Sequence, residues 1–404
     1  MLPDFGAQRQ ASRGEVTINR LPVLKRTSLA SQDRVPENVA PSILFRRGVA
    51  VIWLLLFLAL VISITLFHLR GENLRQFDSP PGQSFDAGHE PSDEHDQVVA
   101  SLGVGIAPIR REPRRKQLAL MREYMDGISE GLDLPATINP TNAAGVPAEW
   151  VTAPGADSDR RVLYLHGGAF VMGSPRSHRN ITNRFSEIAG AAVLAIDYRL
   201  MPEHPRMAGV EDCRTAYRWL LENGPSGPGA PQRLFVAGDS AGGNLTLSLS
   251  AWVRDSGLRQ PDGVVALSPA TDSTLGSPSL KSNMETDAML GPMFRGLASI
   301  PRPLLWWFTW VQSRMSPSNP VISPVFGDLS GLPPTLVHAS EAELLFDDAR
   351  RYVNRAAAAG SPARLQSWAH VVHVWHMFYP QLTEARDAWE EIGKFIAECD
   401  RVPG

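Results

Sequence analysis

One segment near the start of this chain lacks the mixture of polar and apolar residues found elsewhere. Residues 48–67 read GVAVIWLLLFLALVISITLF, with no charged side chain. A run of 20 apolar residues, at about 1.5 Å per helical residue, matches the roughly 30 Å hydrocarbon thickness of a bilayer. A helix buried in a soluble core would normally keep a polar stripe. The pattern therefore predicts a transmembrane signal-anchor helix over residues 48–69.

Beyond residue 100, short apolar runs recur with helix-length segments between them. Most of these runs are hydrophobic throughout, which is typical of parallel strands buried on both faces. The predicted strands are Val162–Leu165, Ala192–Asp197, Leu234–Ala237, Val264–Leu267, Thr335–Ala339 and Ala363–Trp368. The last helix carries one apolar stripe, made of Trp389, Ile392, Phe395 and Ile396. The alternation predicts an α/β fold with a mostly parallel central sheet and helices on both faces.

The segments that flank the apolar helix are polar. Residues 1–47 show no periodicity and are expected to form a cytoplasmic tail. Residues 71–100 hold seven acidic residues and one basic residue among Pro, Gly and Ser. Such a composition cannot bury a core, so residues 70–100 are expected to form a flexible acidic tether. A folded domain over residues 101–404 follows.

Basic residues beside the apolar helix predict its orientation. Arg46 and Arg47 directly precede the helix, whereas Arg70 and Arg75 are the only basic residues soon after it. Because basic residues favour the cytoplasmic side, the N-terminus is expected in the cytoplasm. Everything after Leu69 is then extracytoplasmic, in the periplasm of a bacterium or the secretory lumen of a eukaryote.

Charge and cysteine content exclude several classes of function. The formal net charge is −3, so no strong basic field exists to hold nucleic acid. Cys213 and Cys399 are the two cysteines, which can make at most one bridge and no cysteine zinc site. Metal-ligand spacings and phosphate-binding loops are absent from the sequence, so no cofactor or metal is expected.

A turn between an apolar strand and a helix carries the strongest chemical signal. Residues 238–242 read GDSAG, with Ser240 at the centre, and directly follow the predicted strand Leu234–Ala237. This setting is typical of a nucleophile elbow, whose glycines avoid clashes on either side of the serine. The helix N-terminus behind Ser240 favours a developing oxyanion, and Asp239 is expected to support the motif. The alternative is a glycine-rich turn that only packs a helix on a strand.

A second glycine-rich segment follows the predicted strand Val162–Leu165 and reads HGGAF from His166. Small residues allow backbone N–H groups to approach a substrate carbonyl oxygen, and one such donor stabilises the transition state by roughly 3–4 kcal/mol. The candidate oxyanion donors are the N–H groups of Gly167, Gly168, Ala169 and Ala241. His166 either holds this loop by hydrogen bonds or acts as a catalytic base.

A serine nucleophile also needs a base, and the base needs an orienting acid. The candidate bases follow the last predicted strand and are His370, His373 and His376. The acid should follow the strand Thr335–Ala339, where Glu341 and Glu343 lie on a loop. Asp347 and Asp348 are expected in the first turn of the next helix, where they complement its dipole. The order serine, acid, histidine is that of α/β-hydrolases.

From about residue 100 onward, the chain resembles the hormone-sensitive lipase family of α/β-hydrolase esterases. Residues 166–168, HGG, are similar to the family's oxyanion motif, and residues 238–243, GDSAGG, to its nucleophile motif. Residues 197–205, DYRLMPEHP, are similar to its DYRLAPEHP segment. Where relatives carry a third oxyanion glycine, this chain has Ala169, whose methyl group is expected to narrow the acyl site.

The resemblance implies a role for each remaining candidate. The family's acid stands four residues before the Asp that matches Asp347, which selects Glu343 and leaves Glu341 in reserve. The family's spacing from a tryptophan to the catalytic histidine runs from Trp368 and selects His373. The resemblance also implies a helical cap over the site, built from residues of about 105–135 and 280–320.

These features predict a membrane-anchored carboxylesterase. Ser240, His373 and Glu343 would hydrolyse lipophilic esters of short to medium acyl chain through an acyl-enzyme. One alternative is a lactone or arylformamide hydrolase that uses the same triad. Another is a catalytically inactive, hydrolase-like binding module.

Overall fold

The computed structural model describes residues 39–86 and 90–401, and the chain divides into two compact units, one ending at Leu58 and the other beginning at Ala59. Helix α1 (Val39–Ile64) continues as the π-helical segment η1 (Thr65–Leu69). Residues Phe45–Leu69 are long and apolar enough to cross a membrane, as either a membrane anchor or a signal sequence. Most of the predicted cytoplasmic tail lies outside the described residues, and its last residues, from Val39, are helical.

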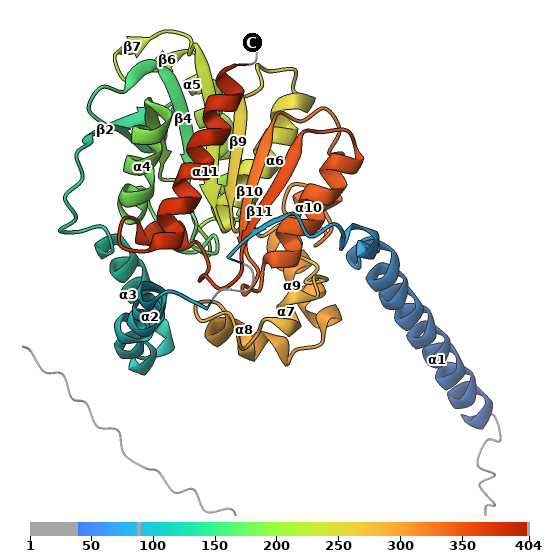
Figure 1. Ribbon diagram of the computed structural model, residues 1–404. Coiled ribbons are helices and arrows are strands. Elements are labelled where there is room, and N and C mark those ends of the chain that lie inside the picture. Colours follow the sequence, from blue (N-terminus) through green and yellow to red (C-terminus); the bar gives the residue numbers. More distant parts are fainter. Residues whose placement is uncertain (1–38, 87–89, 402–404) are drawn as a thin grey trace, which may run out of the picture. The chain divides into compact units, whose positions relative to one another are not determined.

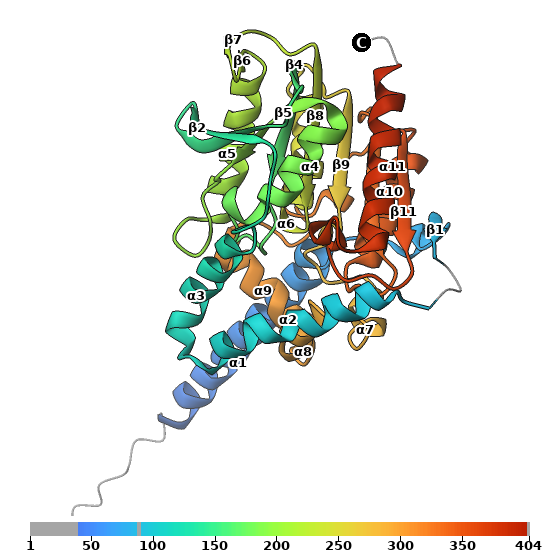
Figure 2. The same ribbon diagram turned by 60° about the vertical axis from the view of Figure 1, so that its left-hand side comes forward.

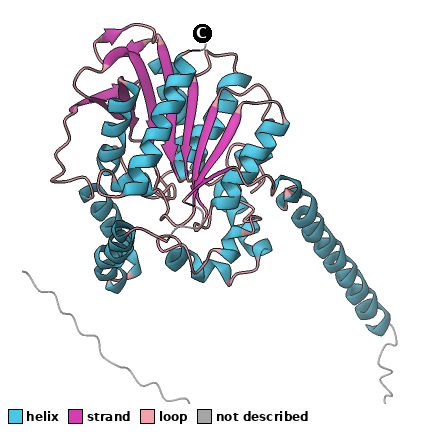
Figure 3. Cartoon of the chain, in the orientation of Figure 1, coloured by secondary structure: helices cyan, strands magenta, loops and turns pink. Residues whose placement is uncertain are grey.

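The second unit is built on a nine-stranded sheet, drawn in magenta in Figure 3. All six predicted strands belong to it, and neighbouring strands are parallel except at β3, which runs antiparallel to both β2 and β5. The order across the sheet is β1 (Gln83–Phe85), β11 (Ala363–Trp368), β10 (Thr335–Ser340), β9 (Gly263–Leu267), β8 (Arg233–Asp239), β4 (Asp157–Leu165), β5 (Ala191–Ile196), β3 (Val146–Thr152) and β2 (Thr137–Ala143). A separate small ribbon pairs β6 (Asn223–Gly224) with β7 (Gly227–Pro228).

Helices cover both faces of the sheet, as predicted (Figure 1). Both faces of the sheet are apolar and need a cover. In β4, the side chains of Val162 and Tyr164 pack toward one face and those of Leu163 and Leu165 toward the other. The first face is covered by α4 (Arg179–Ala189) and α11 (Thr383–Asp400), and the second by α5 (Arg206–Leu220), α6 (Ala241–Asp255) and α10 (Phe346–Ala358). The apolar stripe predicted for the last helix is buried in α11.

The prediction of a flexible acidic tether over residues 70–100 is wrong for the described residues in that range. Strand β1 pairs with β11 at the sheet edge, and Phe85 stacks on Trp368 with ring centroids 4.5 Å apart. Helix α2 (Asp93–Arg111) begins within the same range. The acidic composition was misleading because two of the carboxylates pair with arginines of α10. Asp78 accepts from Arg351 at 2.6 Å, and Glu72 pairs with Arg355.

Further helices lie beyond the carboxyl ends of the strands. Figure 2 shows α2 and α3 (Arg114–Gly127) there, together with α7 (Ser279–Ser282), α8 (Gly291–Ala298) and α9 (Arg302–Ser313). Helices α3, α7, α8 and α9 come from the two stretches of sequence predicted to form a cap, whereas most of α2 lies before the first of them. Elsewhere in the described chain, Cys213 and Cys399 are both buried and make no disulfide.

Candidate active site

Loops at the carboxyl ends of adjacent strands bring the predicted residues to one edge of the sheet. Ser240 follows β8, His166 follows β4, Glu343 follows β10 and His373 follows β11. Parallel strands place their carboxyl ends on the same side, which is where sites form in open α/β sheets. Residues from separate parts of the sequence therefore meet because of strand order, not because of local sequence.

Ser240 stands on a sharp turn between β8 and α6. Its backbone has φ 52° and ψ −115°, a conformation that costs of order 1–3 kcal/mol for a residue with a side chain. The turn is held by the Ser240 N–H, which donates to the carbonyl of Leu267 at 2.7 Å. A Cβ at Gly238 would lie 2.5 Å from the Leu165 carbonyl oxygen, and one at Gly242 would lie closer still. The glycines of the motif are therefore required by the turn, as the sequence predicts.

His373 and Glu343 form a buried pair. Nδ1 of His373 lies 2.5 Å from Oε2 of Glu343, whose other oxygen accepts from the N–H of Ser340 at 3.1 Å. Burial acts to lower the pKa of His373, but the charge and hydrogen bond of Glu343 outweigh it, so the pKa of His373 lies above its ordinary value. The bond at Nδ1 leaves Nε2 as the nitrogen that can take up a proton.

The other candidates for acid and base point elsewhere. Glu341 accepts from Ser367 Oγ at 2.8 Å and also bonds Ser84 Oγ, at the β1–β11 edge. His376 Nε2 lies 3.0 Å from Nδ1 of His338, and burial holds the pKa of His376 well below its ordinary value. His370 lines a depression of about 210 Å³ beside α11. The geometry therefore agrees with the choice of Glu343 and His373.

The segment after β9 links the nucleophile turn to the histidine loop. Leu267 accepts from the Ser240 N–H at 2.7 Å, and the adjacent Ser268 accepts from the Val374 N–H at 3.2 Å. The N–H of Ala270 also donates to the carbonyl of Ser240 at 3.3 Å. Neighbouring residues of one strand end thus bind both the backbone of Ser240 and the residue after His373.

The loop after β4 presents backbone N–H groups but differs from the prediction at one residue. The N–H of Gly167 donates to Oδ1 of Asp239 at 2.9 Å, so it holds the loop and is already used. The loop continues with left-handed backbone at Gly168, Ala169 and Phe170, at φ 111°, 54° and 64°. The remaining candidate donors are the N–H groups of Gly168 and Ala169, together with Ala241, whose position at the start of α6 leaves its N–H without an intrahelical acceptor.

His166 supports this loop and is unsuited to be a base. Its ring is almost fully buried and stacks on Tyr198 at 4.2 Å between centroids. Burial lowers the pKa of His166 to about 3, so the ring stays neutral. The Tyr198 hydroxyl donates to the His166 carbonyl at 2.8 Å, which fixes the backbone at the start of the loop. Of the two roles left open by the sequence, the structure favours loop support.

Asp239 supports the motif with partners that the sequence did not reveal. Besides Gly167, it accepts from the Tyr164 hydroxyl at 2.6 Å, and Nε2 of His178 lies 3.4 Å from its Oδ2. Burial acts to raise the pKa of Asp239, but the neighbouring His178 outweighs it and lowers that pKa. Asp287 was also missed. Its Oδ2 accepts from the N–H of Leu344, which fixes the loop next to Glu343.

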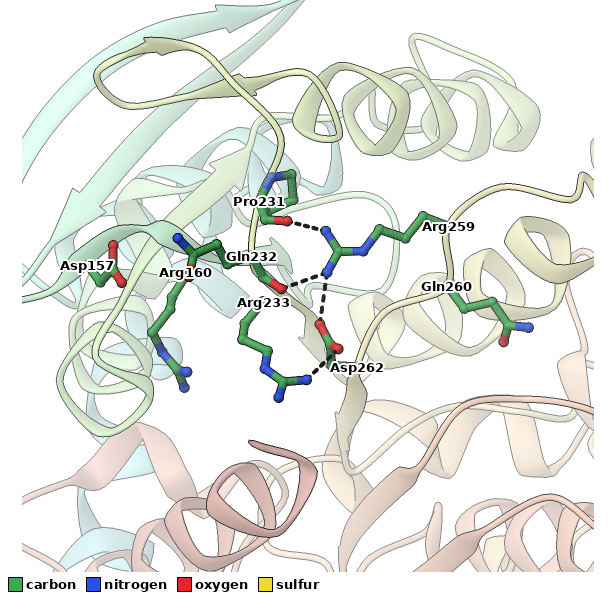
Figure 4. A pocket seen from close by; sticks show the side chains of 8 residues that line it. All are labelled: Asp157, Arg160, Pro231, Gln232, Arg233, Arg259, Gln260 and Asp262. Carbon is green, nitrogen blue, oxygen red and sulfur yellow. Dashed lines mark hydrogen bonds and ion pairs between the residues drawn. The ribbon is translucent and has the colours of Figure 1, made fainter. Parts of the chain in front are cut away.

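A depression of about 660 Å³ lies at the opposite, amino-terminal end of β4, β8 and β9 (Figure 4). Its arginines are paired within the fold. Arg233 bonds Asp262 at 3.0 Å, Arg259 bonds the same carboxylate at 3.3 Å, and Arg160 bonds Asp400 at 2.9 Å. None of the predicted site residues lines this depression, so the candidate chemistry belongs to the carboxyl ends of the strands.

Comparison with known proteins agrees with this geometry. A family profile for the alpha/beta hydrolase fold matches residues 162–377. The chain is 39% identical over 249 residues to an acetyl-hydrolase of Streptomyces hygroscopicus, covering 62% of this chain and 79% of that protein. This chain belongs to the hormone-sensitive lipase family of α/β-hydrolase esterases. Family membership identifies it as a serine carboxylesterase-like hydrolase.

Two further members of this family show how far the likeness extends. The chain is 38% identical over 270 residues to the carboxylesterase/phospholipase LipF of Mycobacterium tuberculosis, covering 65% of this chain and 69% of that protein. A crystal structure of an esterase from the bacterial hormone-sensitive lipase family superposes with a TM-score of 0.65 at 37% identity. That match covers 76% of this chain and 99% of the esterase. The likeness to this esterase thus extends over nearly all of its length.

Proposed function

We propose that this protein hydrolyses carboxylic esters of short to medium acyl chain with Ser240, His373 and Glu343 as its catalytic triad. The observation that carries the proposal is the 2.5 Å bond between the buried Glu343 and Nδ1 of His373. This bond favours the tautomer of His373 in which Nε2 can accept a proton. The loop that carries His373 is bonded through Ser268 to the end of β9, which also binds the backbone of Ser240. No such arrangement is needed for a hydrolase-like binding module.

In the first half-reaction, Nε2 of His373 takes the proton from Oγ of Ser240 as Oγ attacks the ester carbonyl carbon. The negative charge on the carbonyl oxygen is stabilised by the N–H groups of Gly168, Ala169 and Ala241. The carbon–oxygen bond to the alcohol then breaks, and His373 gives its proton to the departing alkoxide. An acyl-enzyme on Ser240 and a free alcohol result.

In the second half-reaction, water takes the place of the alcohol. His373 accepts a proton from water as its oxygen attacks the acyl carbonyl carbon, and the same N–H groups stabilise the new oxyanion. The bond from the carbon to Oγ breaks, and His373 returns the proton to Ser240. The carboxylic acid leaves and no cofactor is consumed.

The proposed acyl range rests on the relatives and on Ala169. One relative is named an acetyl-hydrolase, and a related esterase structure, 34% identical to this chain, was soaked with p-nitrophenyl butyrate. The methyl group of Ala169 adds bulk in the oxyanion loop, which favours short acyl groups. A lactone or arylformamide would use the same triad, but no contact in the described site favours either over a simple ester.

We also propose that the apolar helix anchors the enzyme in a membrane. The helix exposes large apolar side chains along its length, such as Leu54, Leu55 and Phe57. Arg46 and Arg47 on its N-terminal side favour a cytoplasmic N-terminus and an extracytoplasmic catalytic domain. Reporters fused to each end test this orientation. A C-terminal reporter found in the cytoplasm would overturn it.

The hydrolytic proposal is tested with the purified full chain in detergent. Rates on p-nitrophenyl acetate, butyrate and laurate should be highest for the short esters, and Ser240→Ala should abolish turnover of all of them. Undiminished turnover by the variant would refute Ser240 as nucleophile. Absence of turnover by the native chain on every ester would favour the binding-module alternative.

A further inference from the structure

Helix α9 exposes one apolar stripe that the fold of the domain does not need. Leu304, Phe308 and Val311 follow helical spacing and are 62%, 64% and 59% exposed. The opposite side of the helix is packed, since Trp306 is buried and its Nε1 donates to the carbonyl of Thr274 at 2.7 Å. Exposed apolar side chains that gather on one face mark an interaction surface.

The neighbouring helix extends this face. Met293, Leu297 and Ile300, in and just after α8, are 41%, 42% and 39% exposed. Helices α8 and α9 follow one another directly along the chain and lie beyond the carboxyl ends of the strands (Figure 2). We call the exposed apolar residues of these two helices the α8–α9 face.

Helix α9 and the loop after it also contact the end of the apolar helix, through residues next to the exposed stripe. Nε1 of Trp307 donates to Oγ1 of Thr65 at 2.9 Å, and the ring of Trp310 meets His68 edge-on at 6.0 Å. The hydroxyl of Ser316 donates to the His68 carbonyl at 2.5 Å. These contacts lie within the second unit, so α9 is attached to the segment where the apolar helix ends.

The residues at this junction suit a membrane interface. Phe67 is 87% exposed at the end of the apolar helix, and tryptophans are enriched where membrane helices leave the hydrocarbon. Trp307 and Trp310, which pack edge-on at 5.1 Å, occupy this position beside η1. A stripe attached to this point is held close to the bilayer surface by the anchor itself.

A basic corner lies at the same end of the domain. The turn between α2 and α3 carries exposed basic side chains on both of its sides, at Arg110, Arg111, Arg114, Arg115 and Lys116. In both ribbon views, α2, α3, α8 and α9 lie beyond the same edge of the sheet (Figures 1 and 2). Clustered basic residues near a membrane surface attract anionic headgroups by about 1 kcal/mol each.

We propose that the α8–α9 face docks on the surface of the lipid bilayer that holds the anchor, so that the enzyme takes its esters from the bilayer. The docking rests on the exposed stripe, on the contacts of α9 with η1, and on the membrane anchor proposed above. The statement about substrate rests also on the proposed function, and names its substrate class as esters dissolved in lipid. We assign the bilayer as the binding partner of the α8–α9 face because the proposed anchor holds this face next to the bilayer. No second protein is then required.

The docking is tested with the full chain reconstituted in nanodiscs of phosphatidylcholine and phosphatidylglycerol, one chain per disc. A fluorophore is attached to Phe308→Cys, and in a control chain to Gln260→Cys at the opposite end of the domain. Cys213 and Cys399 are buried and do not compete for the label. Lipid-borne nitroxide should quench the label at 308 several-fold more than the label at 260, and iodide in the water should show the reverse order.

Equal quenching by iodide at both positions would overturn the docking. Protection at 308 that exists only when several chains share one vesicle would assign the face to a second copy and would also overturn it. The same quenching is expected in a chain that also carries Ser240→Ala, because docking needs no turnover. Failure of the docking is thereby distinguished from failure of the esterase proposal.

The consequence for substrate is tested by turnover. Leu304→Ser with Phe308→Ser should leave the rate on dissolved p-nitrophenyl acetate unchanged. The same variant should lower kcat/KM about tenfold on p-nitrophenyl laurate dissolved in the bilayer, through a higher KM. Phe308→Leu, which keeps an apolar side chain, should keep the native rate on both. An unchanged KM for the bilayer ester in the double variant would contradict uptake from lipid.

Discussion

The candidate site contains two buried histidine–carboxylate pairs, and they differ in which imidazole nitrogen remains available. In the pair His178–Asp239, Nε2 faces the carboxylate at 3.4 Å, while Nδ1 contacts Ser177 Oγ at 2.8 Å. In the pair His373–Glu343, the 2.5 Å contact at Nδ1 leaves Nε2 for proton exchange. The same pair of residue types thus supports a loop at Asp239, whereas at Glu343 it leaves the imidazole able to act as the proposed base.

The proton balance of the two pairs differs in the same way. Burial acts to lower the pKa of His178, but the charge of Asp239 outweighs burial and raises that pKa. The pKa of Asp239 is lowered at the same time, so the two shifts together favour a charged His178 beside a charged Asp239. In the proposed mechanism, His373 instead accepts and releases a proton in every cycle. The proposed role of each histidine therefore depends on its position relative to Ser240, and not on its being paired with a carboxylate.

The largest expected effect separates the two histidines directly. His373→Gln should lower kcat on p-nitrophenyl acetate by about 10,000-fold or more, because the proposed acceptor of the Ser240 proton is then lost. His178→Gln should lower it only about tenfold, through a looser oxyanion loop. Steady-state kinetics of both folded variants measures the two losses of kcat. Similar losses would contradict the different roles assigned to His373 and His178.

The second prediction concerns the acid. Glu343→Gln should lower kcat by about 1,000- to 10,000-fold, because the wrong tautomer of His373 is then favoured. Glu341→Gln, the matched control, should retain activity within about twofold, since its partners lie at the sheet edge. The reverse ranking would show that Glu341 is the acid.

The pH profile sharpens the same assignment. His373 must be neutral to act, and its pKa is raised above the ordinary 6.5, so kcat/KM of the native enzyme should fall as pH drops through a value above 6.5. In Glu343→Gln, burial acts without the carboxylate charge, so the remaining activity should fall at a lower pH. An acid limb that does not move would contradict the coupling.

The third prediction concerns stability. His178→Ala leaves Asp239 buried without its charge partner and should lower the free energy of unfolding by about 3–5 kcal/mol. Because the pKa of His178 is raised in the folded state, its stabilising contribution is complete below 6.5 and is lost as pH rises through the raised value. Urea unfolding at several pH values measures both effects. A native chain whose pH dependence above 6.5 equals that of the variant would contradict the ion pair.

The smallest expected effect is on acyl selectivity. Ala169→Gly removes the methyl group from the oxyanion loop and keeps the N–H, at a residue whose φ of 54° suits glycine. The ratio of butyrate to acetate rates should rise a few-fold, with kcat on acetate nearly unchanged. A fall in this ratio would show that the methyl group does not limit the acyl site.

Sequence alone predicted the features that depend on local pattern. Continuous apolar runs predict the parallel strands, and the glycines around Ser240 predict the turn. Family resemblance was needed to prefer Glu343 over Glu341, because both lie on one loop. Only the fold shows that Glu341 turns to Ser367 while Glu343 turns to His373.

Features that depend on distant partners could not be read from the sequence. Asp78 and Glu72 look like residues of a solvated tether until Arg351 and Arg355 of α10 are placed beside them. The N–H of Gly167 looks like an oxyanion donor until Asp239 is found to accept it. His178 has no local signature, and its importance follows only from the buried carboxylate that it faces.

Covalent labelling of the nucleophile measures most directly whether His373 activates Ser240. A fluorophosphonate reacts with an activated serine, and peptide mass spectrometry identifies the modified residue. The native chain should be labelled once, at Ser240, and His373→Gln should react at least about 1,000-fold more slowly, whereas His178→Gln should react within about tenfold of the native rate. Labelling at another residue, or undiminished labelling of Ser240 in His373→Gln, would contradict this mechanism.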